Sequence, residues 1–228
     1  MPTISICITV WNEHAELALL LEQLYAVLRP TDEVILQGDQ GKVTPKVVSV
    51  VREYVNRDNF VYLEYPLNRD FATYKNNCIK HAKNDYIFWL DADEMFSVDL
   101  LEIYRQTIAQ SPDTQAFAVP RANVVIGLEN SDVERWRWSV KTEPLVVDFT
   151  VPKKYGVDEQ PKFVNWPDYQ FRIWKNHRGI CYNGNVHEQL TGFKQYAYIE
   201  PELDFALWHV KRIERQRSQN SFYENCLQ

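Results

Sequence analysis

Three carboxylates follow directly on a short apolar segment in the first half of the chain. Residues 86–90 are all apolar, and Asp91, Asp93 and Glu94 come within the next four positions. Burying this much unpaired charge is prohibitively costly, so the acids must meet solvent, a cation or a ligand. Asp91 and Asp93 are two positions apart, so in an extended backbone their side chains point the same way. Two carboxylates at a strand end offer the hard oxygen ligands that Mg²⁺ or Mn²⁺ prefers.

A plainer interpretation of these acids is a polar loop that caps the next helix, with Asp93 or Ser97 as the N-cap residue. A lone Asp-x-Asp pattern is a weak motif and by itself favours the capping loop. The segments before and after it therefore decide between a ligand site and a cap.

The segments upstream of the acids alternate between strand and helix patterns. Strands are predicted at residues 4–10, 33–36, 60–63 and 86–90, and the segments between them carry apolar residues at helical spacing. The unbroken apolar run at 86–90 is typical of a strand covered on both faces. This alternation predicts an α/β fold with a Rossmann-like, mostly parallel sheet flanked by helices.

Polar side chains follow all four predicted strands. Ligands of open α/β sheets bind at the carboxyl ends of the strands. Neither a G-x-G-x-x-G pattern after the first strand nor a P-loop occurs, so side chains and a metal must hold any phosphates. The polar residues at these ends favour a nucleotide-like ligand and are Asn12, Glu13, Asp39, Asn68, Arg69, Asp91 and Asp93.

The second half of the chain is less regular. A helix is predicted at 97–110 and a strand at 116–120, followed from 123 to 167 by a long loop with a short strand near 145–147. Long loops in compact domains are usually functional, so this one is a candidate lid or acceptor-binding region, with a flexible insertion as the alternative. Regular structure is expected again at 169–174, 179–182 and 186–190, with a strand ending at His209 and a charged helix from 210 to about 224.

Composition bounds the class of protein. The 228 residues carry a formal net charge of -6, which argues against general nucleic-acid binding because that requires a basic surface. The four cysteines are scattered, so free thiols in a reducing compartment are expected. The first apolar segment does not resemble a signal peptide, and no apolar run approaches the roughly 20 residues that span a bilayer. We therefore expect a cytoplasmic protein without a transmembrane segment.

Several short motifs occur in a recognisable order. They are Thr9-Val10-Trp11-Asn12-Glu13, Asn68-Arg69-Asp70-Phe71-Ala72 with Lys75-Asn76, Leu90-Asp91-Ala92-Asp93-Glu94, Pro167-Asp168-Tyr169-Gln170-Phe171-Arg172-Ile173-Trp174, Val186-His187-Glu188 and Trp208-His209. This order and spacing resembles family 2 glycosyltransferases with the GT-A fold, in the branch related to lipopolysaccharide core glucosyltransferases. One departure is the turn after the second strand, Gly38-Asp39-Gln40-Gly41-Lys42, where the family usually has a serine-rich acidic turn.

The resemblance implies one GT-A domain over residues 1–228, with a donor half at 1–120 and an acceptor half at 121–228. It implies an enzyme that moves a sugar, with inversion, from a nucleotide-sugar to an acceptor hydroxyl. A UDP-sugar is the expected donor, and a saccharide or glycoconjugate is the expected acceptor. A divalent metal, Mn²⁺ or Mg²⁺, would stabilise the leaving diphosphate.

The resemblance also assigns roles to individual residues. Asp93 would bind the metal directly, Asp91 would bind it through water or hold the ribose, and His209 would be a further ligand. An imidazole among oxygen ligands favours Mn²⁺ over Mg²⁺. The residues expected to contact the donor nucleotide are Thr9, Val10, Glu13, Asp39, Asn68, Arg69, Lys75, Asp91 and Ala92.

An inverting transferase needs a general base for the acceptor hydroxyl. Asp168 and Glu188 both qualify. The resemblance favours Asp168, because similar enzymes place an acid before an Arg-x-Phe/Trp pattern, here Arg172-Ile173-Trp174. A capping role remains an alternative for each carboxylate, as a solvated position on a helix does for Lys75.

Two other functions compete with glycosyl transfer. One is a non-catalytic nucleotide- or carbohydrate-binding module on the same scaffold, and the other is a sugar-phosphate nucleotidylyltransferase. The second is disfavoured because residues 10–14 lack a glycine-rich basic loop.

The basic residues of the C-terminal helix are read as a solvated face, with contact to a phosphorylated acceptor or an anionic membrane surface as the alternative.

Overall fold

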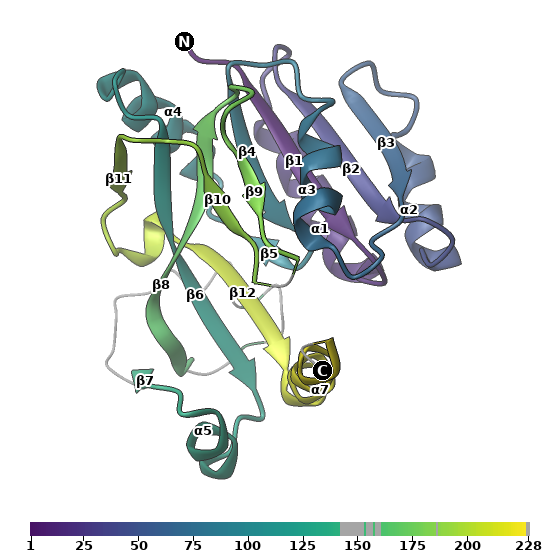
Figure 1. Ribbon diagram of the computed structural model, residues 1–228, viewed down its shortest axis with the longest axis vertical. Coiled ribbons are helices and arrows are strands. Elements are labelled where there is room, and N and C mark those ends of the chain that lie inside the picture. The colour runs from purple at the N-terminus through teal and green to yellow at the C-terminus, as the bar shows by residue number, and fades with distance from the viewer. Residues whose placement is uncertain (142–152, 154–156, 158–160, 186, 227–228) are drawn as a thin grey trace. The chain divides into compact units, whose positions relative to one another are not determined.

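The computed structural model describes residues 1–141, 153, 157, 161–185 and 187–226 (Figure 1). The short strand expected near 145–147 lies outside these residues. The chain divides into two compact units whose segments interleave. Unit 1 contains residues 1–93, 101–118 and 171–197, and unit 2 contains residues 94–100, 119–170 and 198–228. Residues 171–197 thus pack with the first strands of the chain although they follow position 120.

Unit 1 is built on a mostly parallel sheet. Its strands are β1 (Ile4–Val10), β2 (Glu33–Asp39), β3 (Phe60–Tyr65) and β4 (Tyr86–Asp91), in the order β3-β2-β1-β4. These pair in parallel, as the alternation of strand and helix patterns predicts. The second part of β8 (Phe163–Lys175) pairs antiparallel with β4, with Tyr86 opposite Lys175.

The helices of unit 1 follow their strands. They are α1 (His14–Val27), α2 (Pro45–Tyr54), α3 (Phe71–Ile79) and α4 (Leu100–Gln110), of which α4 begins at the boundary with unit 2. The Thr44 side chain caps α2 by accepting from the Val47 amide, and Asp70 caps α3 by accepting from Thr73. Such caps satisfy amides that the first helical turn leaves unpaired. The capped start of α3 fixes where the loop after β3 ends.

The unbroken apolar run of β4 is explained by cover on both faces. Residues 86–90 are all buried. Ile87 and Trp89 join a core cluster with Cys78 of α3 and Trp174 of β8, while Phe88 packs edge-on against Tyr104 of α4. Alternate residues of one strand therefore enter two separate cores.

Two short strands complete unit 1. β9 (Cys181–Asn183) pairs antiparallel with β10 (Gln189–Thr191), and β9 packs against α3. Asn76 of α3 anchors β9, because its side chain donates to the Tyr182 carbonyl and accepts from the Tyr182 amide. β11 (Tyr196–Tyr198) lies at the end of this segment.

Unit 2 is built around three neighbouring strands in the order β6-β12-β5. β12 (Leu207–Arg212) pairs in parallel with β6 (Ala116–Ile126) and antiparallel with β5 (Glu94–Met95). β7 (Val140–Lys141) pairs with the first part of β8. The 3-10 turn η1 (Leu203–Phe205) precedes β12, and the helices are α5 (Asn130–Trp136) and α7 (Ile213–Cys226).

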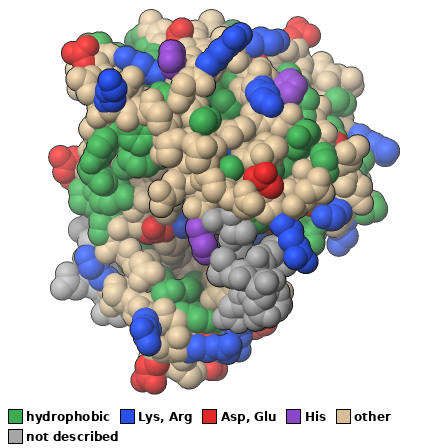
Figure 2. Space-filling view, in the orientation of Figure 1, with side chains coloured by type: hydrophobic (Ala, Val, Ile, Leu, Met, Phe, Trp, Pro, Cys, Tyr) green, Lys and Arg blue, Asp and Glu red, His purple; other side chains and the backbone are tan. Residues whose placement is uncertain are grey.

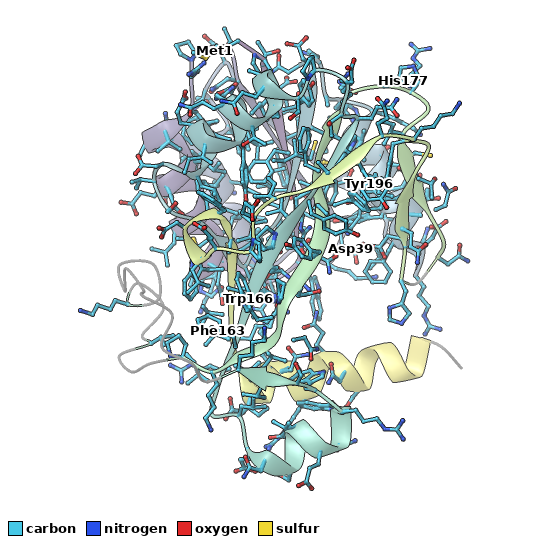
Figure 3. The ribbon with its side chains drawn as sticks, turned by 90° about the vertical axis from the view of Figure 1, so that its left-hand side faces the viewer. Met1, Asp39, Phe163, Trp166, His177 and Tyr196 are labelled. Atoms are coloured by element: carbon cyan, nitrogen blue, oxygen red, sulfur yellow. The ribbon has the colours of Figure 1, made fainter. Side chains whose placement is uncertain are left out.

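An aromatic core holds unit 2 together. The Phe163 ring lies 6.1 Å from the Trp166 ring and 5.7 Å from the Trp208 ring, measured between centroids. Figure 3 shows Phe163 and Trp166 close together near the start of β8. Buried aromatic side chains of this size supply much of the free energy that stabilises a small core.

The regular elements depart from the predicted ones in the second half of the chain. β6 continues to Ile126 rather than ending at 120, α5 occupies part of the expected loop, and β8 begins at Phe163 rather than 169. The expected loop from 123 to 167 is therefore shorter. Residues 210–212 belong to β12, so the C-terminal helix begins at Ile213. No helix within the described part of the chain has the length and apolar character needed to cross a bilayer.

Candidate functional site

The strand ends of unit 1 bring several predicted site residues together. Thr9 of β1 is the register partner of Asp91 of β4 and of Gln37 of β2, and Val10 is the partner of Gly38. Because these strands are parallel neighbours, their carboxyl ends meet at one edge of the sheet, as predicted. Ala92 and Asp93, which follow, are both buried.

The carboxylate of Asp91 is held on both of its oxygens. The Arg172 guanidinium donates to Oδ2 at 2.7 Å, and the Trp89 indole N–H donates to Oδ1 at 3.3 Å. Burial alone would raise the pKa of Asp91, but the positive charges of Arg172 and Lys75 outweigh it and hold the pKa well below its ordinary value. Asp91 is therefore ionised at neutral pH and firmly oriented. This arrangement favours contact with a ribose or a water-mediated contact with a metal over direct ligation.

Lys75 of α3 is not a solvated helix residue. Its ammonium lies 2.6 Å from a carboxylate oxygen of Glu188, and each of these side chains is only 14% exposed. The same ammonium lies 5.1 Å from the Trp89 ring centroid and 4.8 Å from that of Tyr182. Lys75 is thus a desolvated cation held beside the end of β4, where a phosphate is its natural alternative partner to Glu188.

The remaining predicted donor residues shape loops. Asp39 is largely buried, accepts from the Leu67 amide at 3.0 Å and pairs with Lys42 at 3.0 Å. Asn68 and Arg69 follow in the same loop, are exposed and have φ of 47° and 60°. Two consecutive non-glycine residues in this region are strained, and such strain clusters at functional sites.

Glu13 also organises a loop. Its carboxylate accepts from the amides of Trp11 and Asn12 at 2.8 and 3.0 Å. The turn after β1 is thereby closed on itself.

Unit 2 contains a second group of polar residues, centred on Asp168 of β8. Arg121 of β6 donates to Asp168 Oδ2 from Nε at 3.0 Å and from Nη2 at 2.6 Å, and Asn123 donates to the same oxygen at 2.9 Å. Gln170 donates to Oδ1 at 2.9 Å. Glu94, fully buried, lies 3.5 Å from the same guanidinium.

The surroundings of Asp168 keep it ionised. Burial would raise the pKa of this carboxyl, but the charge of Arg121 and the hydrogen bonds from Asn123, Arg121 and Gln170 lower it below its ordinary value. Its side chain remains 25% exposed, so a solvent-borne hydroxyl can reach it.

His209 lies on β12 between two of these residues. It is the register partner of Glu94 on β5 and of Asn123 on β6, and it is half-buried. Its Nδ1 lies 2.9 Å from Asn123 Oδ1. An amide oxygen only accepts, so Nδ1 donates and the lone pair of the neutral ring is on Nε2. Metal-ligating histidines commonly donate from their other ring nitrogen in this way.

The structure describes no cluster of three or more His, Cys, Asp or Glu side chains arranged to hold a metal ion. The side chains expected to hold the ion, an imidazole and a carboxylate, are of the chemical types that bind divalent cations. Asp91 fits direct ligation less well, since Arg172 already occupies Oδ2.

Comparisons with known proteins identify the family of the chain. The family model described as Glycosyl transferase family 2 matches residues 5–182. The chain belongs to this family. A curated protein of Haemophilus influenzae, described as an uncharacterized glycosyltransferase, is 28% identical to the family 2 chain over 129 residues, which are 57% of this chain and 47% of that protein.

Solved structures support the GT-A fold that the sequence predicts. Residues 1–349 of S. aureus TarS in complex with UDP-GlcNAc match with a TM-score of 0.59 and 14% identity, covering 93% of this chain and 59% of that one. A second structure of the same TarS segment gives a TM-score of 0.58 and 13% identity, covering 92% of this chain and 60% of that one. The chain thus spans about half to three fifths of the length of these relatives.

Three site residues of this family 2 chain escaped the sequence-based prediction: Arg121, Asn123 and Tyr182. Gln170 was noted only as part of a motif. Arg121 and Asn123 follow Pro120, which reads as a strand end, yet β6 continues through it. Their spacing of two positions in an otherwise apolar strand could have indicated a polar site, because it places both side chains on one face of the sheet. Arg172 was noted only as part of a motif, and its partner Asp91 could not be foreseen from 81 positions away.

Proposed function

We propose that this chain is an inverting, metal-dependent glycosyltransferase that moves a sugar from a UDP-sugar to an acceptor hydroxyl. The observation that carries the proposal is the oriented, ionised Asp91 at the end of β4, two positions before Asp93 in a chain of family 2. Structures of TarS with UDP-GlcNAc support a UDP-sugar as donor, because they share the fold. A saccharide or glycoconjugate is the proposed acceptor.

The donor residues divide the work of holding a nucleotide diphosphate. Thr9, Val10, Glu13 and Asp39 face the base and ribose in this proposal. Lys75 and Arg69 supply positive charge for the phosphates, and Lys75 would exchange its contact with Glu188 for one with phosphate oxygen. Glu188 thereby keeps the desolvated ammonium neutralised until the donor arrives.

Asp93 and His209 would hold a divalent ion, with Asp91 contributing through water or binding the ribose instead. When bound, the ion offsets the negative charge that develops on the leaving diphosphate. An imidazole ligand favours Mn²⁺.

We assign the general base to Asp168 rather than Glu188. The Glu188 side chain is 14% exposed, against 25% for Asp168, so Asp168 is the more accessible to an acceptor hydroxyl. Asp168 is ionised, partly exposed, and has an oxygen, Oδ1, that accepts a hydrogen bond from Gln170 and retains a second lone pair. Asp168 takes the proton of the acceptor hydroxyl. At the same time the hydroxyl oxygen forms a bond to the anomeric carbon, and the bond from that carbon to the diphosphate breaks.

The metal-diphosphate site can be tested by titrating UDP with Mn²⁺ into the parent protein and into Asp93→Ala. We expect the substitution to weaken binding at least tenfold, while Asp113→Ala, which changes an exposed acid, leaves it unchanged. If Asp93→Ala binds UDP and Mn²⁺ as tightly as the parent, the diphosphate is held elsewhere.

A further inference from the structure

One amide side chain in unit 2 contacts two proposed site residues at once. Asn123 lies on β6, which is hydrogen-bonded to β8 on one side and β12 on the other. Its Nδ2 lies 2.9 Å from Asp168 Oδ2, and its Oδ1 lies 2.9 Å from His209 Nδ1. No element of the proposed function above uses Asn123.

The orientation of this amide is set by its neighbours. On one side lie the carboxylate of Asp168 and, at 3.5 Å, the carbonyl oxygen of Val164. Both groups only accept hydrogen bonds, so the NH₂ of Asn123 must face them. Rotating the amide by 180° would place its oxygen against two acceptors. The amide oxygen therefore faces His209.

This orientation determines the tautomer of His209. Because Asn123 Oδ1 only accepts, the neutral imidazole must carry its proton on Nδ1 and its lone pair on Nε2. Cross-strand register supports the contact, since His209 and Asn123 are direct partners in the β12–β6 pair. Two neighbouring backbones thus hold the two side chains at a fixed separation.

The other half of the amide acts on Asp168. Asn123 and Arg121, both on β6, donate to Oδ2, so the hydrogen bonds from β6 hold that oxygen. Gln170 makes the one described hydrogen bond to Oδ1. Oδ1 therefore keeps a lone pair that can accept the proton of the acceptor hydroxyl.

We propose that Asn123 is a positioning residue for glycosyl transfer. Its NH₂ orients the Asp168 carboxylate, and its oxygen holds His209 in the tautomer whose Nε2 carries the lone pair. The inference rests on the proposed function, because it assigns Asn123 to the same base and metal ligand. It goes further because it states that a single side chain orients both the proposed base, Asp168, and the proposed metal ligand, His209.

Two substitutions separate the two halves of the amide. Asn123→Asp retains an oxygen that accepts from His209 Nδ1 but has no hydrogen to donate to Asp168. Asn123→Leu removes both contacts at similar volume. Asn176→Leu is the matched control. The Asn176 NH₂, like that of Asn123, donates to two acceptors, here the carbonyls of Ala82 and Asn84, but Asn176 lies in unit 1.

The first readout is the ring ¹⁵N spectrum of His209 in the intact, metal-free protein, recorded about two pH units above the ordinary histidine pKa of about 6.5. We expect the Nδ1–H tautomer in the parent, in Asn123→Asp and in Asn176→Leu. In Asn123→Leu we expect a substantial population of the Nε2–H tautomer. An unchanged spectrum in Asn123→Leu would overturn the proposed action on His209.

The second readout is the split between kcat and KM for sugar transfer, together with Mn²⁺ affinity. Changes to residues that orient a metal ligand typically cost about 10–100-fold. We expect Asn123→Leu to lose about that factor in both Mn²⁺ affinity and kcat, and Asn123→Asp to lose it in kcat with the donor KM nearly unchanged. Loss of kcat in Asn176→Leu equal to that in Asn123→Asp would overturn the positioning role.

The tautomer measurement also separates failure of this inference from failure of the proposed function. A parent protein that transfers no sugar would refute glycosyl transfer, and the His209 spectra would still decide what Asn123 does. An active parent with an Nε2–H His209 would refute the role of Asn123 alone. Thermal unfolding of each variant establishes that the comparison is made between folded proteins.

Discussion

Two ion pairs fix the charged side chains around the end of β4. Arg172 holds Asp91 at 2.7 Å and Lys75 holds Glu188 at 2.6 Å, in places where the side chains are largely shielded from water. A charge left alone in such a place costs far more than one at the surface. The residues assigned to the donor therefore also bear on the stability of unit 1.

Arg172→Met should lower the free energy of unfolding by about 1–3 kcal/mol, because it leaves Asp91 without its cation. The value is set below that of a fully buried pair, since Asp91 remains 31% exposed. Arg29→Met is the matched control, because the pair between Arg29 and Glu102 is well exposed and should contribute about 0–1 kcal/mol. Urea unfolding at neutral pH measures both. Equal losses in the two variants would contradict the account of Asp91.

The same carboxylate predicts a pH dependence. The pKa of Asp91 is lower in the folded chain than its unfolded value of about 3.9, so its ionised form stabilises the fold above that pH. The benefit is lost as the pH falls toward the folded pKa. The difference in unfolding free energy between the parent and Asp91→Asn should therefore be constant from pH 7 to about 5 and shrink below about 4. A difference that grows on acidification would contradict this sign.

The assignment of the general base is also a residue-scale prediction. Asp168→Asn should lower kcat by about 10²–10⁴-fold, the usual contribution of general base catalysis, with little change in donor affinity. Glu188→Gln should instead change donor affinity, because it leaves the Lys75 ammonium without its counter-charge. Steady-state kinetics of both variants distinguishes the two acids. The opposite pattern would move the base to Glu188.

At the scale of elements, the first half of the fold could be predicted from the sequence because local patterns and tertiary packing agree there. The strands of unit 1 carry apolar runs, and the helices between them carry apolar residues at helical spacing. The polar residues at their ends fall where the parallel register places them. Thr9 opposite Asp91 follows from that register alone.

The second half was less predictable for identifiable reasons. Pro120 locally predicts the end of a strand. In the structure β6 continues past Pro120, because it pairs with a neighbouring strand on each side. Lys211 and Arg212 suggest a charged helix, but pairing with β6 places them in β12. The partners of Asp168 and of His209 could not be found because they depend on which strands become neighbours.

One element-scale prediction concerns the C-terminal helix. Arg217 of α7 donates to both oxygens of Asp132 on α5, at 3.0 and 2.7 Å, and lies 3.3 Å from Glu129. Because the Asp132 side chain is only 7% exposed and both of its oxygens accept from Arg217, Arg217→Ala should lower the free energy of unfolding. Arg212→Ala, at an exposed position of β12, should change it by less than about 0.5 kcal/mol. Denaturant unfolding of both variants tests whether the basic residues of α7 are structural.

At the scale of the whole molecule, the chain distributes its chemistry over two compact units. Unit 1 contains the strand ends, Lys75, Asp91 and Asp93, and unit 2 contains Asp168, Asn123 and His209. On the face drawn in Figure 2, acidic and basic side chains both occur and neither sign covers the surface. The family assignment covers most of unit 1 and part of unit 2, since it extends from residue 5 to 182.

The measurement that tests the account most directly is calorimetric titration of UDP, GDP and dTDP into the protein, with and without Mn²⁺. We predict that UDP binds most tightly of the three and that Mn²⁺ strengthens its binding at least tenfold. That result would establish the class of donor and leave the sugar and the acceptor to be found by screening. Failure of all three nucleotides to bind, with or without Mn²⁺, would contradict the assignment of a nucleotide-sugar transferase.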